Sequence, residues 1–166
     1  MEVHLRKAQQ ADVDDIAQIH VSSWENAFDG LMPARYIHGY THSSRVDEWQ
    51  GIIRTNVETV VVAERESKVV GFMSYSVHSK HDGIIELSKL YLCPSVYGLG
   101  LGYKLMSYLE RESQELGMKT ISLYVLDNNV SAIQFYSKQG FQLSGGHVSE
   151  EFEGTTIIDV QMIKRV

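Results

Sequence analysis

The sequence predicts a three-layer α/β domain in which helices cover a mixed β-sheet. Its 166 residues suit one hydrophobic core of ordinary size, whereas two domains of half this length would each be marginal. Short apolar runs typical of strands alternate with runs whose apolar residues recur every three or four positions, which is typical of helices. Their order is strand, helices, three strands, helix, strand, helix and two strands. This mixture favours helices packed on a single sheet.

The first third of the chain is predicted to be mainly helical. After a short strand at residues 3–6, Asp12 followed by Asp15 three residues later is typical of a helix N-cap. Pro33 is well placed to open a short second helix, and a further helix is expected over residues 44–54. The first helix carries one stripe of mostly apolar residues, namely Val13, Ile16, Ala17, His20, Trp24 and Ala27.

Strands dominate the middle of the chain. "TVVVAE" (59–64) and "VVGFMSYSV" (69–77), joined by a polar turn, predict an antiparallel hairpin, and "GIIELSKLYL" (83–92) predicts a third strand. A helix then follows a glycine-rich turn and ends at Gly117, with Leu101, Leu105, Leu109 and Leu116 on its apolar face. The remaining elements are the strand "KTISLYVL", the helix "NVSAIQFYSKQ" ending at Gly140, and the strands "FQLSGGHV" and "TTIIDVQMIK".

The composition narrows the classes of partner. Hydrophobic residues at 43% and charged residues at 22% are typical of a globular protein that folds unaided. The sequence shows neither an export signal nor an apolar run of membrane-spanning length, and Cys93 is its single cysteine, so we expect a cytoplasmic protein without a membrane partner. The net charge of −6 argues against nucleic acid and mildly favours a cationic partner.

The stretch "YGLGLGYK", residues 97–104, places three glycines at alternate positions just before a helix. Free backbone N–H groups at a helix start attract phosphate groups, and glycine removes the Cβ that would keep a phosphate away. The spacing matches neither the P-loop nor the dinucleotide-binding fingerprint. Taken alone, the stretch is therefore more simply explained as a flexible turn that lets a helix pack closely.

The surrounding 58 residues, from "IIELSKLYL" to "YSKQGF" (84–141), resemble the GNAT superfamily of N-acetyltransferases. In that superfamily the acetyl-CoA site combines a strand, the loop [QR]-x-x-G-x-[GA], a helix, a strand, and N-x-x-A-x-x-x-Y on a helix ending in Gly-Phe. Tyr97 stands where the superfamily usually has Gln or Arg. The other matching positions here are Gly100, Gly102, Asn129, Ala132, Tyr136, Gly140 and Phe141.

The resemblance implies a GNAT-like fold whose mixed, mostly antiparallel sheet splays at the coenzyme site, with helices on both faces. We therefore expect one domain over residues 1–166: an N-terminal strand and acceptor-side helices (1–56), the acetyl-CoA-binding core (57–141) and C-terminal strands (142–166). The strands "LSKLYL" and "ISLYV" would part to admit the pantetheine arm, and the Leu92 N–H would face the thioester oxygen. The implied coenzyme contacts are Leu90, Tyr91, Leu92, Tyr97, Gly98, Leu99, Gly100, Leu101, Gly102, Tyr103, Asn129 and Tyr136.

Transfer to an amine needs a base and an acid, because an ammonium group has no lone pair and the leaving thiolate gains from a proton. The resemblance assigns the acid to Tyr136 and the base to Glu86, which shares a strand face with Ser88, Leu90 and Leu92 if no bulge intervenes. A packed tyrosine and a structural carboxylate are the alternatives, as a simple N-cap is for Asn129. Cys93 lacks an assigned base partner and is set aside as a nucleophile.

The acceptor side is expected to come from the N-terminal helices and the last hairpin. "WENAFDGLMPARYI" resembles a W-x-x-x-[YF]-x-G-[IL]-x-P segment of bacterial GNAT enzymes, some of them similar to polyamine acetyltransferases. Most of its aromatic residues are expected to pack within the helical layer, although they could also line an amine pocket. The aromatic residues around "WENAFDGLMPARYIHGY" are Trp24, Phe28, Tyr36 and Tyr40, with Glu25, Asp29, Glu150 and Glu151 as carboxylates that would attract a cation or simply be solvated.

The sequence thus predicts an acetyl-CoA-dependent N-acetyltransferase that acts by direct attack in a ternary complex. The acceptor would be a small polyamine-like cation or a peptide amine, as in protein N-terminal or lysine acetylation. The alternative from another class is a non-catalytic acyl-CoA sensor. No metal is predicted, since the pairs His38/His42 and His78/His81 lack a third ligand, and a homodimer remains open.

Overall fold

In the computed structural model, which describes residues 2–166, seven strands form one mixed sheet in the order β1-β2-β3-β4-β5-β7-β6. Every neighbouring pair is antiparallel except β4 and β5, which are parallel, as the fold class predicted from the sequence requires. The strands are β1 (Val3–Lys7), β2 (Thr59–Arg65), β3 (Lys68–Ser79), β4 (Ile84–Leu92), β5 (Thr120–Leu126), β6 (Gln142–Phe152) and β7 (Thr155–Arg165). The α-helices are α1 (Val13–Phe28), α2 (Ala34–His38), α3 (His42–Thr55), α4 (Leu101–Glu115) and α5 (Val130–Lys138).

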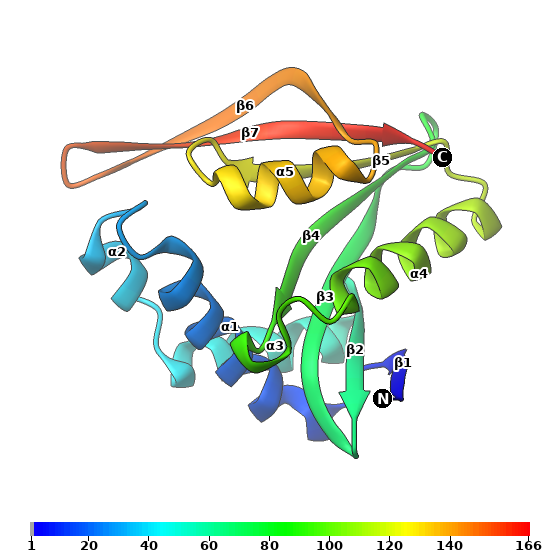
Figure 1. Cartoon of the computed structure of the whole chain (residues 1–166), viewed down its shortest axis with the longest axis horizontal. Coiled ribbons are helices and arrows are strands. Elements are labelled where there is room, and N and C mark those ends of the chain that lie inside the picture. Colours follow the sequence, from blue (N-terminus) through cyan, green and yellow to red (C-terminus); the bar gives the residue numbers. More distant parts are fainter. Residues whose placement is uncertain (1) are drawn as a thin grey trace.

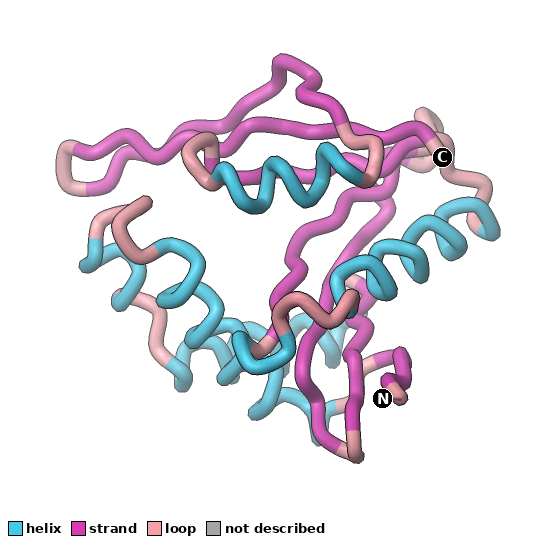
Figure 2. The backbone as a smooth tube through the Cα atoms, viewed as in Figure 1, coloured by secondary structure: helices cyan, strands magenta, loops and turns pink. Residues whose placement is uncertain are grey.

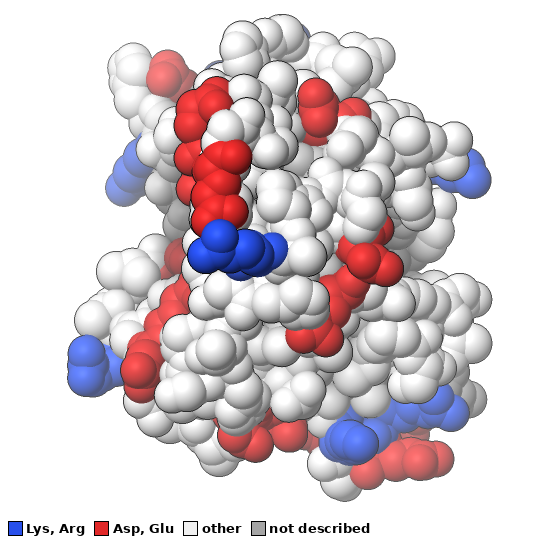
Figure 3. Space-filling view, turned by 90° about the vertical axis from the view of Figure 1, so that its left-hand side faces the viewer, with Lys and Arg blue, Asp and Glu red and all other residues white. Residues whose placement is uncertain are grey.

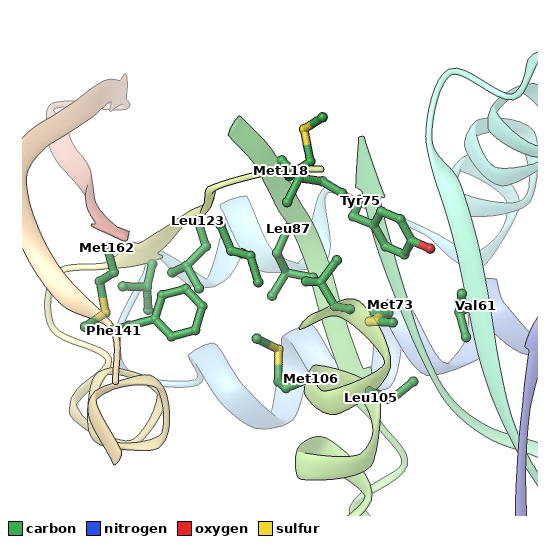
Figure 4. Packing of buried hydrophobic residues seen from close by; sticks show 14 residues of the cluster. Val61, Met73, Tyr75, Leu87, Leu105, Met106, Met118, Leu123, Phe141 and Met162 are labelled. Carbon is green, nitrogen blue, oxygen red and sulfur yellow. The ribbon is translucent and has the colours of Figure 1, made fainter. Parts of the chain in front are cut away.

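Helices α1 and α3 cover one face of the sheet, and α4 and α5 cover the other (Figures 1 and 2). On the first face, α1 and Trp49 of α3 pack on β2 and β3. On the second face, side chains from α4, β3, β4, β5 and β7 meet in one apolar cluster, shown in Figure 4. The predicted face of α4 is buried at Leu101, Leu105 and Leu109, but Leu116 is 49% exposed because it lies at the C-cap, past the last turn that contacts the sheet.

The predicted N-cap at Asp12 is wrong in its detail. Asp12 makes no side-chain hydrogen bond to the first turn of α1, because a short 3-10 turn, Gln10–Asp12, precedes that helix. Its carboxylate instead accepts the backbone N–H of Gln9 at 2.8 Å and two hydrogen bonds from the Arg6 guanidinium, at 2.8 and 2.9 Å. The buried charge is therefore neutralised by a fork-shaped ion pair that ties β1 to the start of α1.

Strands β4 and β5 separate part-way along their length, as the fold prediction required. Their parallel pairing runs only from Ile84 opposite Thr120 to Leu87 opposite Leu123. Beyond that point β4 stays paired with β3 as far as Leu92, while β5 stays paired with β7 as far as Leu126. The two strands consequently diverge in Figure 1 and leave an opening in the sheet, called the strand opening below.

A β-bulge at Ser88 changes which face each β4 side chain occupies. On β3, Ser74 and Tyr75 are adjacent, but their β4 partners are Lys89 and Leu87, so Ser88 is the extra residue. The expected common face of Glu86, Ser88, Leu90 and Leu92 is therefore wrong. Leu90 and Leu92 lie with Leu87 on the α4 side, and Glu86, which neighbours Leu87 before the bulge, lies on the α1 side.

The far end of the β6–β7 hairpin meets α2. The Tyr36 hydroxyl donates to Glu150 at 2.8 Å, Arg35 pairs with Glu153 at 2.7 Å, and the rings of Tyr36 and Phe152 lie edge to face with centroids 5.1 Å apart. The N-terminal helices and the last hairpin thus flank one region of the molecule, on the α1 side of the strand opening (Figure 1). No helix within residues 2–166 is long and apolar enough to cross a membrane.

Candidate active site

The three glycines that precede α4 have two different physical explanations. Gly98 and Gly100 have φ angles of +77° and +81°, in the left-handed region that L side chains adopt at a cost. A Cβ at either position would meet no atom within 4 Å. Gly102 is helical instead, and a Cβ there would lie 2.9 Å from the Phe135 ring, so its bareness lets α4 approach α5.

The loop presents backbone N–H groups at the start of α4. The first main-chain hydrogen bond of the helix runs from Lys104 N–H to the Gly100 carbonyl, at 3.1 Å. The N–H groups of Leu101, Gly102 and Tyr103 precede it and have no intrahelical partner. Together with the open space at Gly98 and Gly100, they form a seat that fits an anion such as a diphosphate.

Tyr97 takes a different position from the other loop residues. Its backbone N–H donates to the Pro94 carbonyl at 3.2 Å and so is already used within the chain. Its side chain is 46% exposed, and its hydroxyl accepts a hydrogen bond from Asn26 of α1 at 3.4 Å. Any contribution of Tyr97 to a ligand would therefore come from the side chain. Leu99 and Tyr103, 46% and 49% exposed, likewise leave apolar side chains uncovered beside the loop.

Backbone groups of β4 face the strand opening at alternate residues. The Cys93 N–H donates to Val70 of β3 at 2.8 Å. Because successive residues direct their N–H groups to opposite edges of a strand, Leu92 and Leu90 direct theirs away from β3, into the strand opening. The Leu92 carbonyl accepts the Ser23 hydroxyl of α1 at 3.1 Å. Tyr91 turns its own backbone toward β3, so only its side chain can reach the opening.

Tyr136 projects from α5, which begins beside the strand opening. Its ring packs edge to face against Phe135 and Phe141, at centroid distances of 5.2 and 5.7 Å. Burial raises the pKa of its phenol well above the usual value, and the nearby Tyr91 phenol raises it further, so Tyr136 keeps its proton at neutral pH. Asn129 is the N-cap of α5: its side-chain oxygen accepts the Ala132 N–H at 3.2 Å.

Glu86 lies close to where the strands part. It is paired opposite Ser76 of β3 and Ser122 of β5, one residue before the last β4–β5 pair. Among residues 2–166, no side chain forms an ion pair or hydrogen bond with its half-buried carboxylate. Cys93 is half-buried, and burial raises the pKa of its thiol, which keeps it protonated and unreactive.

Sequence reasoning missed a polar cluster on the α1 side. His20 is fully buried: its Nδ1 accepts the Trp49 indole N–H at 3.0 Å, and its ring stacks on Tyr91 at 5.1 Å. Burial, and then the charges of Arg45 and Lys89, lower its pKa to about 2, so His20 is neutral. Its place on the stripe of α1 was predictable, but its neighbours come from three other elements.

The aromatic residues of "WENAFDGLMPARYI" pack mainly against one another, as the sequence indicated. Trp24 lies 5.0 Å from the Tyr40 ring and 6.0 Å from the Tyr36 ring. The buried Arg45 guanidinium lies over Trp24 and Tyr40, at 4.6 and 4.1 Å, and pairs with Glu48 at 2.8 Å. These two aromatic faces therefore already hold a cation, one that the chain itself supplies.

Carboxylates gather around the hairpin end of this region, and Figure 3 shows acidic side chains outnumbering basic ones on that face. Glu25 lies 3.6 Å from His38, Asp29 is exposed, and Glu151 accepts the Thr156 hydroxyl at 2.6 Å. Asp159 of β7 was not predicted, although a lone Asp in the apolar run "IIDV" was a visible signal. Burial, then Glu150 and Asp127, raise the pKa of its half-buried carboxyl. Within the described chain, no cluster of three metal-ligating side chains is present.

Comparison with known proteins decides the family. The Acetyltransferase (GNAT) family model matches residues 14–141, most of the chain. The protein belongs to the GNAT family of acetyltransferases. Relatives of this GNAT enzyme include the uncharacterized N-acetyltransferase YuaI of Bacillus subtilis, 26% identical over 157 residues that cover 89% of this chain and 90% of that protein. A Thermoplasma acidophilum spermidine N(1)-acetyltransferase is 24% identical over 148 residues, or 86% of this chain and 90% of the relative.

A solved structure supports the same fold for this GNAT enzyme. The PaiA N-acetyltransferase of Thermoplasma acidophilum, crystallised with coenzyme A, superposes with a TM-score of 0.78 at 23% identity, and the match covers 100% of both chains. The relatives are named N-acetyltransferases, and so the protein is an enzyme of that class. The glycine loop, the strand opening and α5 all lie within or beside the matched segment.

Proposed function

We propose that this GNAT enzyme transfers the acetyl group of acetyl-CoA directly to a primary amine, with both substrates bound together. The observation that carries the proposal is the strand opening, into which Leu90 and Leu92 direct free N–H groups beside the uncapped start of α4. A thioester arm needs such backbone donors, and a diphosphate needs such a helix start. The solved relative from Thermoplasma holds coenzyme A.

The residues present fit the coenzyme in three places. The diphosphate would sit on the N–H groups of residues 101–103, where Gly98 and Gly100 leave room. The pantetheine arm would lie along β4 and accept hydrogen bonds from Leu90 and Leu92. The uncovered side chains of Tyr97, Leu99 and Tyr103 would flank the ligand near the loop.

The reaction needs one proton removed and one supplied. Acetyl-CoA provides a thioester whose carbonyl carbon the amine attacks, so a C–N bond forms and the C–S bond breaks. Leu92 would donate its N–H to the thioester oxygen as negative charge develops there. Glu86, near the closed end of the strand opening, would take the proton from the acceptor ammonium, and Tyr136 would give its phenolic proton to the departing sulfur.

A small polyamine-like cation is the acceptor that the surroundings favour. Glu150 and Asp159 lie on the α1 side with no basic side chain among residues 2–166 within ion-pair distance. The net charge of −6 adds a long-range attraction for cations. A Bacillus subtilis spermine/spermidine N(1)-acetyltransferase is 33% identical over 86 residues, which cover 48% of this chain and 57% of that protein.

The test is thiol release from acetyl-CoA with spermidine, spermine, an alanine-terminated peptide and a lysine peptide as acceptors. We expect turnover with the polyamines. Tyr136→Phe should lower kcat about 10- to 1000-fold and leave acetyl-CoA affinity, measured by calorimetry, within a factor of about two. Tyr75→Phe is the matched control, because the Tyr75 hydroxyl is buried on the α4 face without a hydrogen-bond partner among residues 2–166 and should not affect turnover.

Two results would overturn the proposal in different ways. Undiminished kcat in a folded Tyr136→Phe enzyme would remove that phenol from proton transfer. Tight acetyl-CoA binding by the wild-type protein without thiol release to any amine would instead identify a coenzyme-binding module that does not catalyse transfer.

A further inference from the structure

Tyr91 occupies a distinctive place on β4, between the two residues whose N–H groups face the strand opening. Its backbone is paired with Phe72 of β3, and its side chain lies on the α1 side, stacked on His20 with ring planes 24° apart. The roles proposed above for the glycine loop and for α5 do not involve this side chain. The resemblance to the family implied only that Tyr91 is part of the coenzyme-binding stretch.

The Tyr91 hydroxyl is fixed by a single hydrogen bond. The Trp24 indole N–H lies 2.9 Å from the Tyr91 oxygen, and an indole N–H can only donate, so Tyr91 is the acceptor. One oxygen lone pair is thereby used, and the second remains available. No side chain or carbonyl among residues 2–166 accepts the phenolic proton. Trp24 thus holds the phenol in place and leaves its remaining bonding capacity to be used by another molecule.

Tyr91 lies in the part of β4 beyond Leu87, the last residue paired with β5, so it borders the strand opening on the α1 side. Burial raises the pKa of Tyr91 to about 12, while the Trp24 hydrogen bond and Arg45 oppose the increase and Asp159 and Glu48 add to it. Asp159 lies on β7 and Tyr136 on α5, both beyond the opening from β4. The Trp24 hydrogen bond therefore holds the Tyr91 phenol at the α1-side edge of the strand opening.

We propose that Tyr91 is an acceptor-binding residue whose free oxygen lone pair accepts an N–H of the attacking amine. This inference rests on the proposed transfer to an amine. The nitrogen must keep its own lone pair free for the thioester carbon, so the group that holds it has to accept an N–H. A neutral phenol does this without favouring the ammonium form, so it can hold the amine after Glu86 has taken its proton.

Steady-state kinetics of Tyr91→Phe, with spermidine and acetyl-CoA varied in turn, test this role. The substitution removes one oxygen and keeps the ring stacked on His20. We expect the KM for the amine to rise about 10-fold, the loss associated with one hydrogen bond, and the KM for acetyl-CoA to stay within about twofold. Tyr75→Phe again serves as the control and should match the wild type.

A second variant separates binding from a general structural effect. Trp24→Phe removes the N–H that fixes Tyr91 and should raise the KM for the amine about 3-fold. If the two residues act as one unit, the double variant should be no worse than Tyr91→Phe alone. Equal effects of Tyr91→Phe on both KM values would show a structural role and overturn the proposal. So would an unchanged KM for the amine in an enzyme whose wild type acetylates spermidine, and that result would leave the transferase function intact.

Discussion

Substitutions at Gly100 separate two reasons why glycine suits the start of α4, where the diphosphate is proposed to bind. One is the backbone conformation, and the other is the absence of a charged side chain. The Gly100 φ of +81° is in the left-handed region, where a residue with a Cβ loses about 1–2 kcal/mol. No atom lies within 4 Å of the position a Cβ would take, so steric overlap within the protein contributes nothing. Gly100→Ala should therefore lower the free energy of unfolding by about 1 kcal/mol, and Gly100→Asn by less, because Asn tolerates this conformation.

Gly100→Asp adds a negative charge to the same shape as Asn. Two unit charges 4 Å apart interact by about 4 kcal/mol at the effective dielectric constant of a protein surface, and part of this is lost to salt and solvent. The aspartate should therefore weaken acetyl-CoA binding about 100- to 1000-fold relative to the asparagine. Lowering the ionic strength should widen the difference.

Isothermal titration with acetyl-CoA, together with urea unfolding of each variant, measures the two effects independently. Comparing aspartate with asparagine cancels the backbone cost and the added bulk, so what remains is charge. Equal dissociation constants for Gly100→Asp and Gly100→Asn would refute the placement of the diphosphate at the start of α4. Equal unfolding free energies for all four proteins would refute the assigned backbone strain.

Further predictions concern stability and packing. The pKa of His20 is about 6.5 in the unfolded chain but about 2 in the folded protein, so the free energy of unfolding should fall by about 1.4 kcal/mol per pH unit below 6.5. Urea unfolding at about pH 6 and pH 5 measures this pH dependence, and His20→Leu should lack it. A pH dependence as steep as that of the wild type in His20→Leu would contradict the burial of a neutral His20. Asp12→Asn should lower the free energy of unfolding, measured in urea, by about 2 kcal/mol, because it weakens the pair with Arg6. An unchanged unfolding midpoint would show that Glu64 alone is enough to hold the Arg6 guanidinium. Gly102→Val should push α4 from Phe135 and lower the melting temperature, with Gly98→Asn as a milder control; equal melting temperatures would exclude that close contact.

The sequence predicted those features that are encoded over short distances. The order of strands and helices follows from apolar periodicity and from turn residues such as Gly117, whose left-handed φ of +71° closes α4 as predicted. The motif positions around Gly100 and Tyr136 were identified by resemblance to the family, and the structure gives the loop and α5 geometries compatible with those roles. Pro33 opens α2 as its fixed φ angle favours.

Features that depend on how strands pair across the sheet could not be predicted from the sequence. The bulge at Ser88 has no local signature, because it is set by how β3 and β4 align, and alternation therefore put Glu86 on the wrong face. The contacts of Tyr91 come from His20 and Trp24 of α1 and Phe72 of β3, so no spacing along the chain indicates them. Asp12 was assigned to the wrong partner because Arg6 lies on another element and its guanidinium binds more strongly than a helix N–H.

The bulge at Ser88 sets which β4 side chains lie on each face of the sheet where β4 borders the strand opening. Downstream of it, Leu90 and Leu92 lie on the α4 side and Tyr91 on the α1 side, so under the proposed function a substitution of Tyr91 would alter the choice of amine while Leu90 and Leu92 kept their backbone contacts with the thioester arm. Deleting Ser88 would leave Leu87 and Lys89 adjacent opposite Tyr75 and Ser74 and so keep both sets of side chains on their faces, whereas a one-residue insertion that stayed in the ladder would exchange them.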